Sequence, residues 1–182
     1  MRDLQTAAAA EQFERRYVAP HQGRTLVVGS RIYGAKADRR RLYADAIGVD
    51  MLAGPGVDVV QDLEDTAAAV TALGRFNHIE CLSVLEHSRR PWLLAKTLEK
   101  LLVRGGTLHL QVPFVWRLHD YPGDFWRFTA EALPVLFPST EWRAIRYASD
   151  RLRPDAYLPA QDGDGGQPYF PRCEVCGFGV RT

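Results

Sequence analysis

Short apolar segments alternate with helical ones along most of this chain, and this alternation limits the folds open to it. Continuous apolar runs bounded by Gly, Pro and Asp are typical of strands that are buried on both faces. Strands separated by helices form βαβ units with right-handed crossovers. The sequence therefore predicts a mostly parallel sheet covered by helices, with strands at residues 24–28 (RTLVV), 46–50 (AIGVD), 57–60 (VDVV), 76–85 (FNHIECLSVL) and 107–114 (TLHLQVPF).

The helices expected between these strands are marked by their composition and their ends. Residues up to about Tyr17 are rich in Ala, Glu, Gln and Arg, which favour a leading helix. Residues 66–73 (TAAAVTAL) suit a second helix with Thr66 as its N-cap. Residues 88–106 (SRRPWLLAKTLEKLLVRGG) predict the clearest helix, which Ser88 can cap and the final glycine pair can stop.

The composition of the chain limits which binding partners and which cellular compartment are expected. The 182 residues carry a formal net charge of +1, which gives no electrostatic reason to expect nucleic acid or an anionic membrane as a partner. The run Arg39–Arg41 is interpreted as a solvated helix face. Three cysteines, an odd number, suit a reducing compartment. With no apolar run of membrane-spanning length and no secretion signal, we expect a cytoplasmic protein.

Acidic residues follow three neighbouring strands. Asp50 ends the second strand, Asp62 follows the third with Glu64 close behind, and Glu86 follows the fourth. Ligands of open α/β sheets bind at the carboxyl ends of the strands. An acid after the second strand can accept hydrogen bonds from ribose hydroxyls, and one after the third is well placed for an adenine amine. Together they predict an adenosine ligand laid across the strand ends.

The turn after the first strand fits neither of the common phosphate-binding loops. In the segment GSRIYGAK, Arg31 stands where a dinucleotide loop has its second glycine. Ala35 stands where a triphosphate loop has its lysine, and Ala37 follows Lys36 where that loop needs a hydroxyl for Mg²⁺. An adenosine ligand without phosphates needs only a glycine and a few N–H groups here. S-adenosylmethionine is such a ligand.

These segments resemble the class I S-adenosylmethionine-dependent methyltransferases, in the broad small-molecule branch often called type 11. The resemblance runs from about Arg24 to Phe137. It rests on TLVVGS, GVDM and VVQDLED, and above all on the succession LEH, P, L, L, GG, VP within residues 76–114. The segment 119–133 (HDYPGDFWRFTAEAL) is similar to one that follows the fifth strand in some members.

What the resemblance implies is a three-layer Rossmann-like α/β fold with a seven-stranded, mostly parallel sheet whose last strand is antiparallel. It implies one domain over residues 1–182: a leading helix at 1–22, a cofactor-binding core at 23–137 and shortened C-terminal strands at 138–182. The reaction implied is methyl transfer from a sulfonium to a small-molecule nucleophile. The acceptor and the oligomeric state stay open.

By position in the resemblance, Gly29 approaches the cofactor, Asp50 binds the ribose, and Asp62 with Leu63 meets the adenine. Arg31 is a candidate for seating the methionine carboxylate. The full set of cofactor-binding residues expected is Gly29, Ser30, Arg31, Asp50, Met51, Asp62, Leu63, Leu82 and Ser83.

The loop after the fifth strand carries polar groups beside aromatic ones, which suits a substrate wall. For a hydroxyl acceptor, His119 is the expected base, with Asp120 behind it. Tyr121, Asp124, Trp126 and Arg127 are the expected substrate contacts. The alternative for the last part of this loop is an Asp124–Arg127 ion pair that pins it; both can hold at once. For His87, a structural hydrogen bond is favoured over a catalytic role.

Other functions remain open. A methyltransferase-like fold could be kept as a non-catalytic binding or structural module whose first motif has decayed, and Arg31 motivates this alternative. A nicotinamide-dependent reductase is a weaker one. Cys173 and Cys176 form a C-x-x-C pair, but tetrahedral zinc needs four ligands and only Cys81 remains, so no metal is expected.

Overall fold

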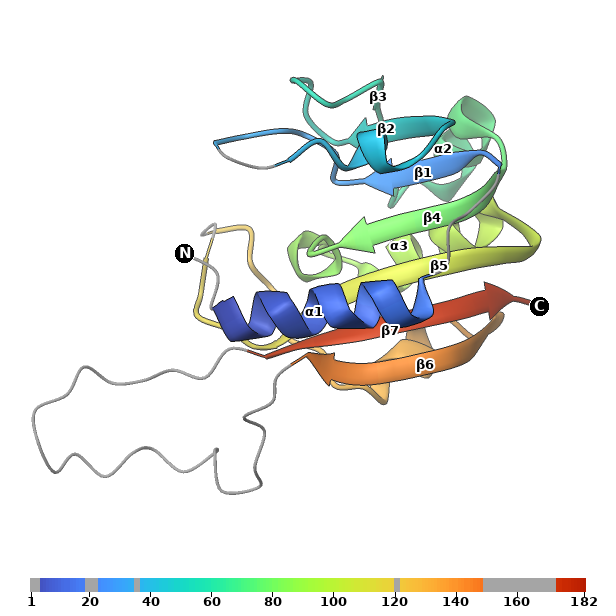
Figure 1. Cartoon of the computed structure of the whole chain (residues 1–182). Helices are drawn as coiled ribbons and strands as arrows, with labels where there is room; N and C mark the ends of the chain where they lie inside the picture. Colours follow the sequence, from blue (N-terminus) through green and yellow to red (C-terminus); the bar gives the residue numbers. More distant parts are fainter. Residues whose placement is uncertain (1–3, 19–22, 35–36, 120–121, 149–172) are drawn as a thin grey trace, which may run out of the picture.

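The computed structural model describes residues 4–18, 23–34, 37–119, 122–148 and 173–182. They form a seven-stranded sheet in the order β3-β2-β1-β4-β5-β7-β6 (Figure 1). Strands β1 to β5 pair in parallel, whereas β7 lies antiparallel between β5 and β6. The fold class and the antiparallel last strand are therefore as expected. The strands are β1 (Thr25–Val28), β2 (Ala46–Asp50), β3 (Val59–Val60), β4 (Phe76–Leu82), β5 (Leu102–Val115), β6 (Thr140–Ala148) and β7 (Cys173–Arg181).

Helices cover both faces of the sheet, which gives the three layers (Figure 1). Helix α1 lies against β6 and β7, where Phe13 packs on Ala144, Ala148 and Cys176. Helices α2 to α4 cover the other face and enclose the main apolar core with the inward side chains of the strands. The helices are α1 (Leu4–Tyr17), α2 (Thr66–Leu73), α3 (Pro91–Leu101) and α4 (Ala132–Leu136), with 3-10 turns η1 (Arg39–Leu42) and η2 (Leu85–His87).

The clearest predicted helix is shorter than expected at both ends. Ser88 does not cap α3, which begins at Pro91, and the helix ends at Leu101 rather than at the glycine pair. Leu102 already belongs to β5 and pairs with Phe76 of β4. The next β4 pairing joins His78 to Thr107, so the residues between bulge out, with Gly105 at a φ of 76°. Glycine is common in bulges of this kind within strands. The helical spacing of the leucines before it led the sequence to predict a helix end here instead.

Helix α2 has the expected bounds but a different N-cap. The Asp65 carboxylate accepts a hydrogen bond from Ala68 N at 3.1 Å and caps the helix. The Thr66 hydroxyl instead lies 2.7 Å from the hydroxyl of Thr97 in α3. Thr66 therefore joins the two helices rather than ending one.

The arginine run was wrongly interpreted as a solvated face, because Arg39 reaches into the sheet. Its guanidinium donates to Glu80 of β4 at 2.5 Å and to Glu14 of α1 at 2.7 Å. Tyr43 also donates to Glu80, which is 1% exposed. Burial acts to raise the pKa of Glu80, but its interactions with His109, Arg39 and Tyr43 lower that pKa to about 2. This carboxylate therefore stays charged, and Arg39 joins it to Glu14 and so links β4 to helix α1.

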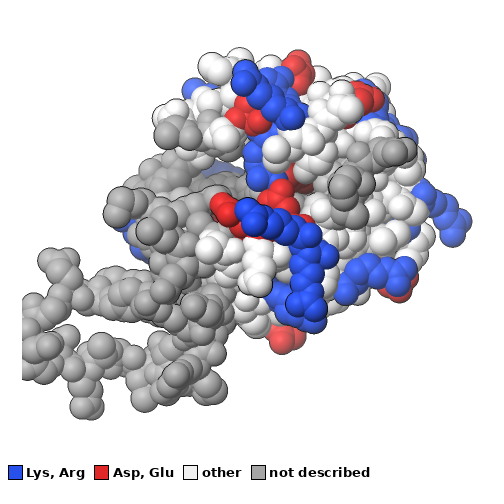
Figure 2. Space-filling view, viewed as in Figure 1, with Lys and Arg blue, Asp and Glu red and all other residues white. Residues whose placement is uncertain are grey.

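Charged side chains of both signs are interspersed over the face shown in Figure 2, in keeping with the small net charge. In the part of the chain that the structure describes, none of the helices has the length and the apolar character needed to span a membrane.

Replacing Arg39 tests the buried ion pair. We expect Arg39→Ala to lower the free energy of unfolding by about 3 kcal/mol, because Glu80 keeps its charge in the interior without its cation. Arg41→Ala is the matched control: its side chain is 86% exposed, and the loss should stay below about 0.5 kcal/mol. Urea unfolding of both variants measures the difference. Equal losses in the two would show that the Arg39 contact contributes nothing.

Candidate functional site

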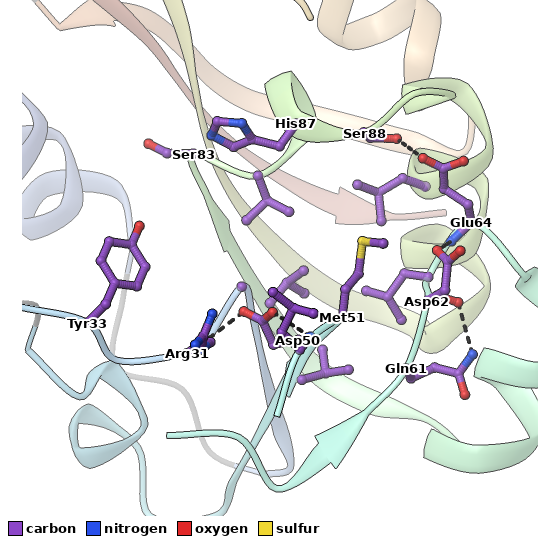
Figure 3. Close-up of a pocket in the computed structure, with 17 residues that line it drawn as sticks. Arg31, Tyr33, Asp50, Met51, Gln61, Asp62, Glu64, Ser83, His87 and Ser88 are labelled. Carbon is purple, nitrogen blue, oxygen red and sulfur yellow. Dashed lines mark hydrogen bonds between the residues drawn. The ribbon is translucent and has the colours of Figure 1, made fainter. Parts of the chain in front are cut away.

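A pocket of about 410 Å³ opens at the carboxyl ends of β1, β2, β3 and β4. In Figure 3, Arg31 and Tyr33 lie on one side of it and Gln61, Asp62 and Glu64 on the other, with Asp50 and Met51 between them. This is the edge of the sheet at which a ligand was expected. The lining residues are Val28, Gly29, Arg31, Tyr33, Val49, Asp50, Met51, Leu52, Gln61, Asp62, Leu63, Glu64, Ser83, Val84, His87, Ser88 and Leu94.

Gly29 is required where the chain leaves β1. Its φ is 66°, and a Cβ at this position would lie 2.6 Å from a methyl carbon of Val84 in the loop after β4. Any side chain here would therefore be strained and would also clash. The missing side chain lets the two loops approach each other and brings backbone to the pocket wall.

Asp50 is held in place by the backbone and still has capacity to bind. One carboxylate oxygen accepts from Arg31 N at 3.2 Å and the other from Leu52 N at 3.0 Å (Figure 3). A carboxylate offers about four lone-pair sites, so both oxygens can accept a further hydrogen bond from a ligand. The two N–H groups fix the position of the carboxylate in advance.

The loop after β3 supplies the next part of the wall. Asp62 accepts from Glu64 N at 2.8 Å, which closes a tight turn around Leu63. Glu64 in turn accepts from Ser88 Oγ at 2.8 Å and from Arg89 N at 2.9 Å. Glu64 therefore ties this loop to the start of α3, where the helix dipole favours a negative charge.

Ser83 leaves β4 in an unusual conformation. It is the described non-glycine residue with a positive φ, 55°, and its N–H donates to Gln111 O at 2.8 Å. Such strain concentrates at functional sites, where the surrounding structure holds it in place. The turn directs Ser83 to the pocket across from Asp50 (Figure 3).

Most of the expected cofactor residues come together, and two do not line the pocket. Gly29, Arg31, Asp50, Met51, Asp62, Leu63 and Ser83 line it, but Ser30 and Leu82 are absent from its wall. Ser30 is buried, and its hydroxyl lies behind the wall, 2.6 Å from the place where a Cβ on Gly48 would stand. The pocket also takes in Tyr33, Leu52 and Gln61, which sequence reasoning missed. Each lies within four residues of a residue that was expected to bind the cofactor. Its nearness along the chain to such a residue was the one signal in the sequence that could have predicted it.

The loop after β5 does not line this pocket, but it lies beside it. Asp124 accepts two hydrogen bonds from Arg127, at 2.6 and 2.7 Å, so the expected ion pair forms. Arg127 also donates to the carbonyl oxygens of Trp116 and Arg117 and thereby pins the loop. The hydrogen bonds from Arg127 hold the pKa of Asp124 at about 2.

Asp124 lies behind His119. Its carboxylate accepts from His119 N at 2.9 Å, and Nδ1 of the same histidine lies 3.0 Å from Oδ2. The ring centroids of His119 and His87 are 4.9 Å apart. Trp126 donates from Nε1 to Ser88 O at 2.8 Å, which joins this loop to the pocket wall. Asp120 and Tyr121, both expected at this site, lie outside the described residues.

His87 makes the structural hydrogen bond expected of it and also lines the pocket. Its Nδ1 lies 2.8 Å from Gly123 O, and Nε2 lies 3.7 Å from Oε1 of Glu86. Glu86 is 1% exposed, and in the described part of the chain its Oε2 has no hydrogen-bond partner. Burial is the main cause that raises the pKa of Glu86 to about 8. An uncompensated acid therefore lies directly behind the pocket.

Several solved structures that share this fold are described as methyltransferases. NodS from Bradyrhizobium japonicum WM9, an N-methyltransferase in complex with S-adenosyl-L-homocysteine, superposes with a TM-score of 0.61 at 11% identity over 96% of this chain and 86% of its own. The 1,6-didemethyltoxoflavin-N1-methyltransferase of Burkholderia thailandensis, with its substrate and S-adenosylhomocysteine bound, gives 0.62 at 13% over 98% and 79%. A Haloferax volcanii protein described as a methyltransferase, in complex with the Trm112 activator, gives 0.64 at 14% over 97% and 90%.

At these identities the likeness shows the fold: this chain has the fold of the class I S-adenosylmethionine-dependent methyltransferases, as its motifs predicted. No protein-family model and no curated protein matches the sequence.

Replacing Glu86 tests its buried state. In its folded environment Glu86 keeps a proton up to about pH 8, whereas in the unfolded chain it loses that proton near its ordinary pKa. The folded protein therefore loses stability as the pH rises between these two values. We expect the isosteric Glu86→Gln, measured by urea unfolding in EDTA, to gain at least about 1 kcal/mol over the wild type between about pH 5 and about pH 8. A pH-independent difference would contradict this.

Proposed function

We propose that this protein is an S-adenosylmethionine-dependent methyltransferase that acts on a small molecule. The observation that carries the proposal is Asp50, held by two backbone N–H groups at the end of β2 with lone pairs left for two ribose hydroxyls. The bound S-adenosylhomocysteine of NodS and of the toxoflavin enzyme supports the same cofactor for this fold.

The other lining residues fit the rest of that cofactor. The turn Asp62–Leu63 meets the adenine, and Met51 and Leu52 give it an apolar cover because both side chains are largely exposed beside the pocket. Gly29 lets backbone approach the sugar and the amino-acid end. Arg31 packs its stem over Gly54, and its guanidinium pairs with the methionine carboxylate in this proposal.

The acceptor enters from the side of His87 and the loop after β5. Methyl transfer is an in-line displacement, so orientation of the nucleophile and the methyl group supplies most of the rate. For a hydroxyl acceptor, His119 takes the proton, and Asp124 stabilises the imidazolium that forms. Trp126 and Arg127 shape this wall, and Asp124 acts on the acceptor only through His119. An amine acceptor, as in NodS, needs less help from a base.

Isothermal titration calorimetry with S-adenosylhomocysteine tests the cofactor. We expect one site per chain, and about a 30-fold loss of affinity in Asp50→Asn, because hydrogen bonds to a charged group are worth about 2 kcal/mol. Asp45→Asn, an exposed acid just before β2, is the control and should bind like the wild type. Wild-type protein that gives no heat at high concentration would sink the proposal and favour a non-catalytic module.

Replacing Arg31 distinguishes the proposed methyltransferase from the non-catalytic module. We expect Arg31→Ala to weaken S-adenosylhomocysteine about tenfold, the worth of one charge-assisted pair. The same variant should bind methylthioadenosine, which lacks the amino-acid end, as well as the wild type does. Calorimetry with both ligands separates the carboxylate contact from general damage. Tighter binding of either ligand by the variant would instead mean that the Arg31 side chain obstructs the pocket.

A further inference from the structure

We infer that Glu86, His87 and His119 form a binding site for one first-row divalent cation, with Zn²⁺ as the best fit. One imidazole nitrogen of each histidine and one carboxylate oxygen of Glu86 all lie within 4.8 Å of one another. Ligands at about 2.1 Å from a tetrahedral ion lie about 3.4 Å apart, so rotation of the side chains by an ångström or so closes the set. Nε2 of His87 and Oε1 of Glu86 are already 3.7 Å apart.

Both histidines have the outer contacts that metal-binding histidines use. A ligating imidazole almost always donates its other N–H to a carbonyl or a carboxylate, which fixes its tautomer and its direction. Nδ1 of His87 lies 2.8 Å from Gly123 O, and Nδ1 of His119 lies 3.0 Å from Oδ2 of Asp124. The hydrogen bond to Gly123 O leaves Nε2 of His87 for the cation. Nδ1 of His119 has Oδ2 of Asp124 as an ion-pair neighbour but makes no hydrogen bond among the described residues, so a small rotation of the ring completes this outer contact when Nε2 binds the cation. Asp124 in turn is held by Arg127, so the outer contacts are themselves fixed.

Glu86 supplies the observation that points to a ligand. Its side chain is 1% exposed, and Oε2 is fully buried without a hydrogen-bond partner among the residues that the structure describes. Buried polar atoms without a partner are rare and costly. The charged groups that act on it most strongly include the acids Asp124 and Glu174 and the cation Arg127, whose guanidinium is already paired with Asp124. A divalent cation held by both oxygens of this carboxylate gives Oε2 a partner and offsets this excess of acid.

The chemistry of the set selects the ion. Two imidazoles and a carboxylate suit Zn²⁺ and its first-row neighbours, whereas Mg²⁺ prefers oxygen ligands. Three protein ligands leave one position of a tetrahedral ion open for water or substrate. Because His87 also lines the cofactor pocket, this open position lies next to it.

The cation site does not require the proposed methyl transfer, but it changes the role of His119 within it. With an ion bound, His119 is a ligand, and the ion rather than the imidazole acidifies an acceptor hydroxyl or a bound water. Cation binding is measured on the protein alone. Failure of cation binding is therefore distinguishable from failure to bind S-adenosylhomocysteine.

The test is a titration of the full chain, freed of metal by EDTA and dialysis, with Co²⁺ followed by its visible absorption, and then displacement by Zn²⁺. We expect one ion per chain, tetrahedral Co²⁺ bands and no competition from Mg²⁺. Glu86→Gln, His87→Ala and His119→Ala should each weaken Zn²⁺ about 100-fold or more. Asp124→Asn, which removes the charge beside His119 and weakens the pair with Arg127, should weaken it about 10- to 100-fold.

The Cys173→Ala/Cys176→Ala double variant is the control, since the C-x-x-C pair is the other soft ligand set in the chain. It should keep the affinity of the wild type. Far-UV circular dichroism of each metal-free variant checks folding, and Glu86→Gln keeps the shape of the site if the alanine variants unfold. Zn²⁺ affinity that survives both Glu86→Gln and His119→Ala, or that disappears with the cysteines, would overturn the inference.

Discussion

The pocket depends on the close approach of two loops, at Gly29 after β1 and at Val84 after β4. The space between them at Gly29 admits a hydrogen atom but no methyl group. The positive φ of Gly29 is a second, independent reason why a residue with a side chain would be strained there. In the loop after β4, next to Val84, Ser83 has a left-handed backbone conformation. The hydrogen bond from its N–H to Gln111 O of β5 holds it there. Separating these loops would open the wall between the two central strands and release the turn that presents Ser83.

Acids at neighbouring strand ends perform different tasks, although the sequence shows them as one pattern. Asp50 keeps free lone pairs at the pocket, Glu64 joins two loops and Asp65 caps a helix. Parallel strands bring their carboxyl ends to one edge of the sheet, so the position of Asp50 and Asp62 could be predicted from the order of the segments. Which acid binds a ligand and which supports the backbone depends on N–H groups that become neighbours only in the folded chain.

The errors of sequence reasoning arise in the same way, from contacts between residues that become neighbours only in the folded chain. Arg39 meets Glu80, a partner 41 residues away, and no local pattern announces the pair. Ser30 and Leu82 are adjacent to pocket residues, but neighbouring side chains along an extended chain point in opposite directions. Gly105 comes after a segment with helical periodicity and yet belongs to β5. Strand β5 already pairs with β4 at Leu102, before the glycine is reached.

The place of β7 in the sheet has a consequence for the order in which the protein can assemble on the ribosome. Strands β1 to β4, whose carboxyl ends line the pocket, pair with one another and with β5, and all of these strands are made before β6. Strand β6 has β7 as its neighbour in the sheet, so it has no partner until residues 173–181 have been synthesised. Glu174, which accepts from Gln111 beside the buried acid Glu86, arrives on the same strand. The wall of the pocket can therefore form early in synthesis, while the charge balance around Glu86 is completed only after β7 has been made.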